Sequence, residues 1–237
     1  MTVAQLRRPG GELASRPLHF FWIVDCSGSM SSEKISTVNH AIQEAIPDMR
    51  EAADDNPNAQ LMVRTLRFSS GAEWMTEEPV RIEDFSWDDL KTDGITNLGM
   101  AFDLLSEQLT IPPMSDRALP PVLVLLSDGQ PTDDYKSALE RLLSLPWGRK
   151  SVRIAISIGQ DANDDVLCEF TGRSDLILPA KNAPALAKMI KWASTVASMV
   201  SSPSSRPTEI SGGEEERLYV GFNNVPSPDE VVTGDVW

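Results

Sequence analysis

The sequence predicts an α/β protein in which helices cover both faces of a mostly parallel β-sheet. Three short runs are almost wholly apolar, as is typical of strands buried on both sides: residues 18–24, 122–126 and 152–158. Four longer segments place apolar side chains at helical spacing: residues 33–53, 98–109, 134–145 and 183–200. Strands that alternate with helices favour right-handed crossovers, which bring the carboxyl ends of the strands to one edge of the sheet.

Shorter segments complete the predicted order of elements. Residues 60–69 have the alternation of a strand, and shorter extended pieces are expected at 73–75, 80–85 and 175–178. A short helix is expected at 163–170. Pro47 predicts a kink or break within the first helix, and Pro146 with Gly148 ends the helical pattern that begins at residue 134.

The composition limits the class of protein. With 237 residues, 41% of them hydrophobic, the chain can bury one sizeable α/β core or two small ones. No apolar run approaches the ~20 residues that span a bilayer, and the first 16 residues lack the apolar segment of a signal peptide. Cys26 and Cys168 do not make a disulfide framework, so we expect a cytoplasmic protein without a membrane partner.

The charge and the scarcity of histidine narrow the choice of ligand. A formal net charge of −14 makes nucleic acid a poor partner and favours a cation or a basic protein surface. Only His19 and His40 are present, and no C-x-x-C pair occurs, so a zinc site of nitrogen and sulfur ligands is not expected. A hard cation bound by oxygen atoms remains open.

Composition also divides the chain into three parts. Residues 1–16 are expected to form a flexible N-terminal arm, and residues 17–200 the folded domain. Residues 201–237 are acidic and rich in Ser, Pro and Gly, which predicts a flexible tail. The tail could be a phosphorylated regulator, a blocker of the domain's own metal site or an inert solubilising segment.

Oxygen-bearing side chains follow the predicted strands where parallel sheets bind their ligands. The first cluster follows the strand at 18–24, the second lies in the loop before the helix at 98–109, and the third follows the strand at 122–126. The candidate metal ligands are two carboxylates and three hydroxyls: Asp25, Ser27, Ser29, Thr96 and Asp128. Such a set favours Mg²⁺, with Mn²⁺ or Ca²⁺ as alternatives, and leaves a coordination position for an acidic group of another molecule.

Three stretches carry a resemblance to a known family: FFWIVDCSGSM, TDGITNLGMAFDLL and PVLVLLSDGQPTDD. Asp25-x-Ser27-x-Ser29, with Thr96 and Asp128 downstream, resembles the metal-ion-dependent adhesion site (MIDAS) of von Willebrand factor type A (VWA) domains. The similarity covers about residues 17–200. It implies a Rossmann-like, doubly wound sheet of about six strands with one short antiparallel edge strand. It also implies bound magnesium and a role in protein–protein interaction rather than catalysis.

Within that family, the sequences of the three loops resemble those of the bacterial tellurium-resistance TerY-like proteins. Those proteins are cytosolic stand-alone domains, often paired with a Ser/Thr kinase and a PP2C-type phosphatase. The resemblance implies a part in stress response or phospho-signalling with such partners. The chain departs from members that carry a cysteine-rich C-terminal extension, because it has no cysteine after Cys168.

Other interpretations of the same residues stay open. Asp25, Ser27 and Ser29 alone could form a turn that caps the next helix, and Asp133 and Asp134 are expected to stand at a helix N-terminus. A metal-dependent phosphoesterase of the haloacid-dehalogenase type also places an aspartate after its first strand. That chemistry needs a second acid two residues later, where this chain has Ser27. A serine hydrolase is not expected, since the chain has no G-x-S-x-G elbow.

Overall fold

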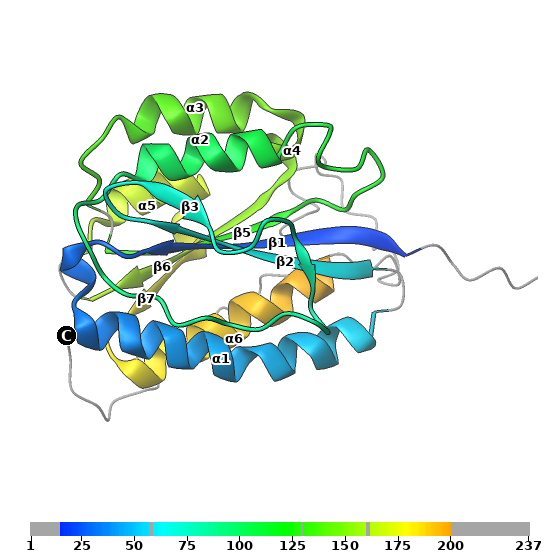
Figure 1. Cartoon of the computed structure of the whole chain (residues 1–237), viewed down its shortest axis with the longest axis horizontal. Coiled ribbons are helices and arrows are strands. Elements are labelled where there is room, and N and C mark those ends of the chain that lie inside the picture. Colours follow the sequence, from blue (N-terminus) through cyan, green and yellow to red (C-terminus); the bar gives the residue numbers. More distant parts are fainter. Residues whose placement is uncertain (1–14, 57–58, 129, 160–161, 201–237) are drawn as a thin grey trace, which may run out of the picture.

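A seven-stranded sheet lies between two layers of helices in the computed structural model (Figure 1). The structure describes residues 15–56, 59–128, 130–159 and 162–200. The strands are β1 (Arg16–Asp25), β2 (Ala59–Phe68), β3 (Ala72–Trp74), β4 (Val80–Arg81), β5 (Val122–Ser127), β6 (Val152–Ile158) and β7 (Ile177–Ala180). Their order is β3-β2-β1-β5-β6-β7, with β4 also paired to β2.

Helices cover both faces of this sheet, as the sequence predicts. One face is covered by α1 (Ser32–Asp54) and α6 (Ala183–Val200). The other is covered by α2 (Leu98–Gln108), α3 (Tyr135–Ser144), α4 (Pro146–Lys150) and α5 (Asp164–Thr171). Two short 3₁₀ turns are η1 (Gly28–Met30) and η2 (Ser174–Leu176). Pairing among β2, β1, β5, β6 and β7 is parallel, so the predicted α/β fold class is confirmed.

A few elements differ in detail from the expectation. Both β3 and β4 pair antiparallel with β2, so the antiparallel edge consists of two short strands. The expected break at Pro47 is wrong, because α1 runs through it without interruption. Pro47 and the residue four positions earlier, Gln43, lie on the exposed side of α1, where water can replace the missing hydrogen bond. After α3, Pro146 begins a further short helix.

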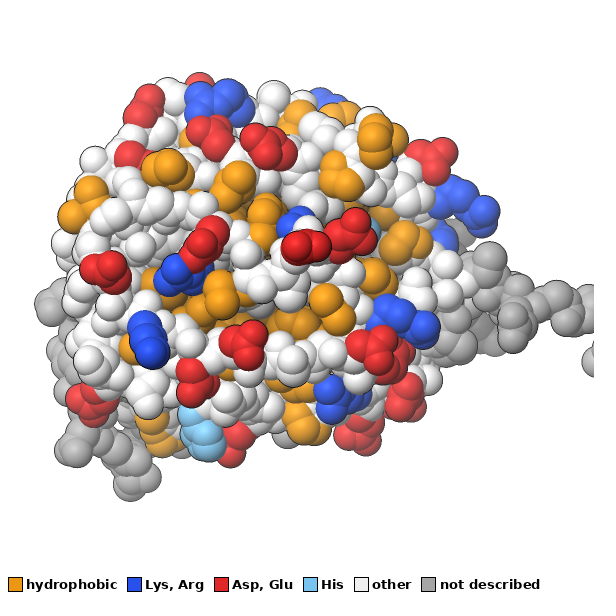
Figure 2. All heavy atoms as spheres, in the orientation of Figure 1, with side chains coloured by type: hydrophobic (Ala, Val, Ile, Leu, Met, Phe, Trp, Pro, Cys, Tyr) orange, Lys and Arg blue, Asp and Glu red, His pale blue; other side chains and the backbone are white. Residues whose placement is uncertain are grey.

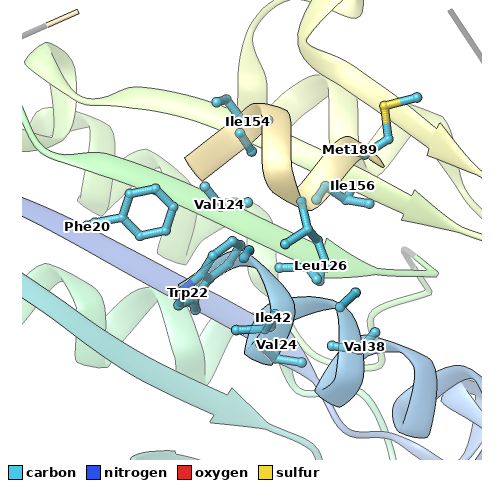
Figure 3. Packing of buried hydrophobic residues seen from close by; sticks show 14 of the residues in the cluster. Phe20, Trp22, Val24, Val38, Ile42, Val124, Leu126, Ile154, Ile156 and Met189 are labelled. Atoms are coloured by element: carbon cyan, nitrogen blue, oxygen red, sulfur yellow. The ribbon is translucent and has the colours of Figure 1, made fainter. Parts of the chain in front are cut away.

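The central strand β1 explains why the first apolar run has no polar face. Phe20, Trp22 and Val24 point toward α1 and α6, where they pack with residues of β5 and β6 (Figure 3). Phe21 and Ile23 point to the opposite side, into the core beneath α2 and α5. All five side chains are fully buried. This double-sided packing holds the carboxyl end of β1 in place, and with it the loop that follows.

The surface and the chain ends complete the description. On the face shown in Figure 2, acidic side chains are scattered among polar ones, in keeping with the acidic composition. Strand β1 begins at Arg16, at the predicted boundary of the N-terminal arm. Residues 1–14 of that arm and the predicted tail at 201–237 lie outside the described residues.

Because His19 is buried, we expect this residue to lower the stability of the protein in acid. Burial lowers the pKa of His19 from 6.5 to about 4, so the folded protein holds this imidazole neutral when the unfolded chain protonates it. Stability is therefore lost as the pH falls from 6.5 toward 4. Between pH 7.5 and pH 5, the free energy of unfolding should fall by about 2 kcal/mol less in His19→Leu than in the wild type. Urea unfolding at both pH values measures this difference.

Candidate metal centre

The first loop of the candidate site begins at the last residue of β1. Asp25 is fully buried. Its Oδ1 accepts a hydrogen bond from the Ser27 backbone N–H at 2.8 Å, and its Oδ2 accepts one from Ser127 Oγ at 2.6 Å. The hydroxyl oxygens of Ser27 and Ser29 lie 3.0 Å apart. The loop therefore gathers the three predicted ligands of this stretch within one turn of chain.

The second loop, residues 93–97, is joined to the first by two backbone hydrogen bonds. The Asp93 N–H donates to the Cys26 carbonyl at 2.7 Å, and the Gly28 N–H donates to the Gly94 carbonyl at 3.0 Å. Gly28 is the residue between the two predicted serine ligands. These bonds bring Thr96, far away in sequence, to the loop after β1.

The third loop follows β5 and binds both of the others. The Thr132 N–H donates to the Thr96 carbonyl at 2.7 Å, and the Thr132 hydroxyl donates to Asn97 Oδ1 at 3.1 Å. Just before this loop, Ser127 at the end of β5 donates to Asp25 at the end of β1. Each of the three loops is thus hydrogen-bonded to the other two.

The two carboxylates of the site are both buried. Asp128 is only 3% exposed, and its Oδ1 has no hydrogen-bond partner among the described residues. Burial raises the pKa of Asp25, the hydrogen bonds from Ser127 and Ser27 oppose this rise, and the negative charge of Asp128 adds to it. Two like charges that feel each other in a buried place are stabilised by a cation between them. The orphaned oxygen and the charge pair therefore fit a metal ion.

The donor set also bears on the kind of ion. Thr96, 5% exposed, and Ser27 are buried, whereas Ser29 is exposed. Within the described ranges, no group of three or more His, Cys, Asp or Glu side chains could hold a metal. An ion bound here would take hydroxyl oxygens and water beside two carboxylates, and such a shell suits Mg²⁺ better than a soft metal.

The segment that leads into Thr96 is held by α1. Residues 82–97 contain neither helix nor strand. The buried amide of Asn39 donates to the Leu90 carbonyl at 2.9 Å and accepts from the Leu90 N–H and from Trp87 Nε1, at 2.9 and 3.1 Å. Because these bonds are shielded from water, they fix the course of a segment that has no ladder of its own.

Two residues that support the candidate site, Ser127 and Asp133, were not predicted as site residues from the sequence. Ser127 precedes the predicted ligand Asp128 directly and binds Asp25, so its only signal was its place at the end of a buried strand. Asp133 was expected at the N-terminus of α3. That role belongs to Asp134, which accepts from the Ser137 N–H, while Asp133 accepts from the first N–H groups of α2, at Gly99 (3.0 Å) and Met100 (3.1 Å).

Removing the Asp133 carboxylate should loosen the start of α2. We expect Asp133→Ala to lower the free energy of unfolding by about 1–2 kcal/mol, because two helix N–H groups lose a charged acceptor. Asp134→Ala, which removes an exposed cap from α3, should lower the free energy of unfolding by less than Asp133→Ala does. Only the Asp133 variant should also weaken Mg²⁺ binding, measured by calorimetry, since α2 follows Thr96. Equal Mg²⁺ affinity in both variants would contradict this coupling.

Cys26 and Met30 lie in the core rather than at the surface of the site. Both side chains are fully buried. Burial raises the pKa of the Cys26 thiol to about 12, so the thiolate required for nucleophilic chemistry is strongly disfavoured. Cys26 is therefore a packed core residue.

A sequence model of the von Willebrand factor type A domain matches residues 21–191, well over half of the chain. The chain belongs to the VWA domain family. The matched range contains all five predicted metal ligands and the three hydrogen-bonded loops of this VWA domain. A comparison with curated protein sequences finds no match.

Solved structures agree with the fold of this VWA domain. The von Willebrand factor type A protein of Catenulispora acidiphila superposes with a TM-score of 0.55 at 16% identity, over 78% of this chain and 43% of that one. The ArnB paralog VWA2 of Sulfolobus acidocaldarius gives 0.55 at 20% identity, over 74% and 44%. Proximal thread matrix protein 1 of the mussel byssus, with a zinc-occupied MIDAS motif, gives 0.56 at 14% identity, over 79% and 47%. The chain spans less than half the length of these proteins. Among the described residues, none of the helices is long and apolar enough to cross a membrane.

Proposed function

We propose that this VWA domain is a Mg²⁺-dependent module that binds a partner protein. The ion is held by oxygen atoms of Asp25, Ser27, Ser29, Thr96 and Asp128, directly or through water. The partner contributes the carboxylate of an Asp or Glu to a remaining coordination position. The observation that carries the proposal is the mutual hydrogen bonding of the three loops around a buried carboxylate pair with one unpartnered oxygen.

Electrostatics favours an acidic ligand from outside. With two carboxylates and neutral hydroxyls around it, a divalent ion keeps an unsatisfied attraction for a further anionic oxygen. Structures of similar fold include a pilus adhesin of Lactobacillus rhamnosus GG and the zinc-occupied byssus protein, which supports a metal-mediated contact without identifying the ion here. Mn²⁺ and Ca²⁺ are alternative occupants.

Calorimetric titration with MgCl₂ tests the metal site. We expect saturable binding by the wild type and loss of at least about tenfold in affinity in Thr96→Val and Asp128→Asn, since each removes an oxygen donor or a charge. Asp93→Asn is the matched control, because it neutralises an exposed acid of the same loop that is not a proposed ligand. Unaltered affinity in Thr96→Val and Asp128→Asn would refute the proposed ligand set.

Capture of partners from the native host tests the interaction. Proteins retained by the wild type in Mg²⁺ should be lost in EDTA and with Asp25→Ala. Proteins retained equally in all three conditions would refute metal-mediated recognition. Metal-dependent turnover of p-nitrophenyl phosphate, abolished by Asp25→Asn, would instead support the alternative of a phosphoesterase.

The cellular setting follows from the TerY-like resemblance of the loops. We propose a cytoplasmic protein of a bacterial stress or tellurite-resistance system, with a Ser/Thr kinase and a PP2C-type phosphatase as candidate partners. Purified candidates of these two classes, added with Mg²⁺ or EDTA, give the direct test. Their failure to bind would overturn the choice of partner while leaving the metal-dependent module intact.

A further inference from the structure

Two exposed hydrophobic residues flank the proposed metal ligand Thr96. In the part of the chain that the structure describes, the large hydrophobic side chains that stay exposed are Ile95 (53%), Met100 (47%) and Ile111 (59%). Ile95 directly precedes Thr96, and Met100 lies four residues after it, in the first turn of α2. Ile111 lies beyond the other end of the same helix. Exposed apolar residues are common singly, but here two of them adjoin one candidate ligand.

Both residues are held in place by the same neighbours. The Ile95 N–H donates to Ser70 Oγ at 3.2 Å. The Asn97 side-chain amide donates to the Ser70 carbonyl at 2.8 Å and contacts Met100 Sδ at 3.6 Å. The Met100 N–H is in turn bound by Asp133. Ile95 and Met100 are therefore presented on a fixed backbone, which lowers the entropic cost of binding to them.

We propose that Ile95 and Met100 form an apolar subsite beside the metal, and that the partner segment carries a large apolar side chain within about three residues of its metal-binding carboxylate. The proposal rests on the proposed function, whose acid it extends into a two-part recognition signal. Ile95 adjoins Thr96 in the chain, and Asn97 on its other side contacts Met100 Sδ, so we expect a segment whose carboxylate reaches the ion to contact these two side chains. Burial of that apolar side chain adds affinity that the carboxylate alone does not supply.

Synthetic peptides give a defined probe for this subsite. One series carries a single Asp in a Gly/Ser background with Leu one, two or three residues away on either side. Matched peptides replace Leu by Ser, or Asp by Asn. Binding of the biotinylated full-length chain, tetramerised on streptavidin, is measured in Mg²⁺ and in EDTA. We expect the best Asp-plus-Leu peptide to bind about tenfold more tightly than its Asp-plus-Ser match, and only in Mg²⁺.

Variants separate the subsite from the metal. Ile95→Ser with Met100→Ser should reduce the Asp-plus-Leu peptide to the level of the Asp-plus-Ser peptide, while Mg²⁺ affinity by calorimetry stays within about twofold. Ile111→Ser, an equally exposed residue at the other end of α2, should retain the full preference.

Each other outcome overturns a definite part of the argument. Mg²⁺-dependent binding without a preference for Leu refutes the apolar subsite and leaves the metal-dependent module standing. A preference for Leu that persists in EDTA or in the Asp-to-Asn peptides refutes the proposed function. A loss caused equally by Ile111→Ser places the apolar contact elsewhere, and absence of binding by every peptide counts against both.

Discussion

Asp25→Asn is expected to raise the free energy of unfolding of the metal-free protein by about 1–2 kcal/mol and to abolish its stabilisation by Mg²⁺. Asp25 is fully buried, and its raised pKa shows that burial outweighs the hydrogen bonds from Ser127 and Ser27. For a carboxyl group with a raised pKa, the free energy of unfolding falls as the pH rises from the unfolded pKa toward the folded pKa. An amide of the same shape removes the charge.

Thermal unfolding in EDTA and in excess Mg²⁺ measures both effects. A gain of about 1–2 kcal/mol corresponds to about 2–8 °C for a domain of this size. In the wild type, Mg²⁺ at 100 times its dissociation constant should add about 2.7 kcal/mol. Asp93→Asn, the exposed acid in the neighbouring loop, should leave both values nearly unchanged. A less stable Asp25→Asn protein that still responds fully to Mg²⁺ would contradict the assignment of Asp25 to the metal site.

The features of the fold that could be predicted are those in which burial produces a pattern of apolar residues within a single segment of the sequence. Strand β1 is apolar on both faces because each face packs into its own core, and its continuous apolar run is visible in the sequence alone. The helical periodicity of α1 and α6 is also visible in the sequence, because one face of each helix is buried against the sheet. The break predicted at Pro47 does not occur, because the cost of proline depends on whether water can reach that face of the helix, which only the packed structure shows.

For the candidate site, the sequence supplied the proposed ligands but not what holds them. The placement of Asp25, Thr96 and Asp128 after strands or before a helix followed from the rule for parallel sheets. The contacts of Ser127 with Asp25, of Thr132 with Thr96 and of Asp133 with α2 join loops that are far apart in the chain. No local sequence pattern identifies such pairs, because any Ser, Thr or Asp side chain in a loop can instead hydrogen-bond to the backbone of its own turn.

The turn that supports Thr96 gives the second large expected effect, from Gly94→Ala. Gly94 has φ of +71°, and a Cβ atom there would overlap the hydroxyl of Ser70, the group that receives the Ile95 N–H. Its carbonyl also receives the Gly28 N–H from the first loop. We expect a loss of about 2–4 kcal/mol in the free energy of unfolding, from backbone strain and displacement of Ser70. Mg²⁺ affinity should fall about tenfold or more, because Thr96 is two residues away.

Matched glycine and serine variants separate the causes. Gly71→Ala, in the same turn as Ser70, meets no atom within 4 Å and should cost about 0.5 kcal/mol or less. Ser70→Gly removes the overlapping side chain, so Gly94→Ala should be less damaging in that background than in the wild type. What remains, about 1–2 kcal/mol, is the strain of a left-handed alanine. If Gly94→Ala instead behaved like Gly71→Ala in both stability and Mg²⁺ affinity, the second loop would not be the rigid support that positions Thr96.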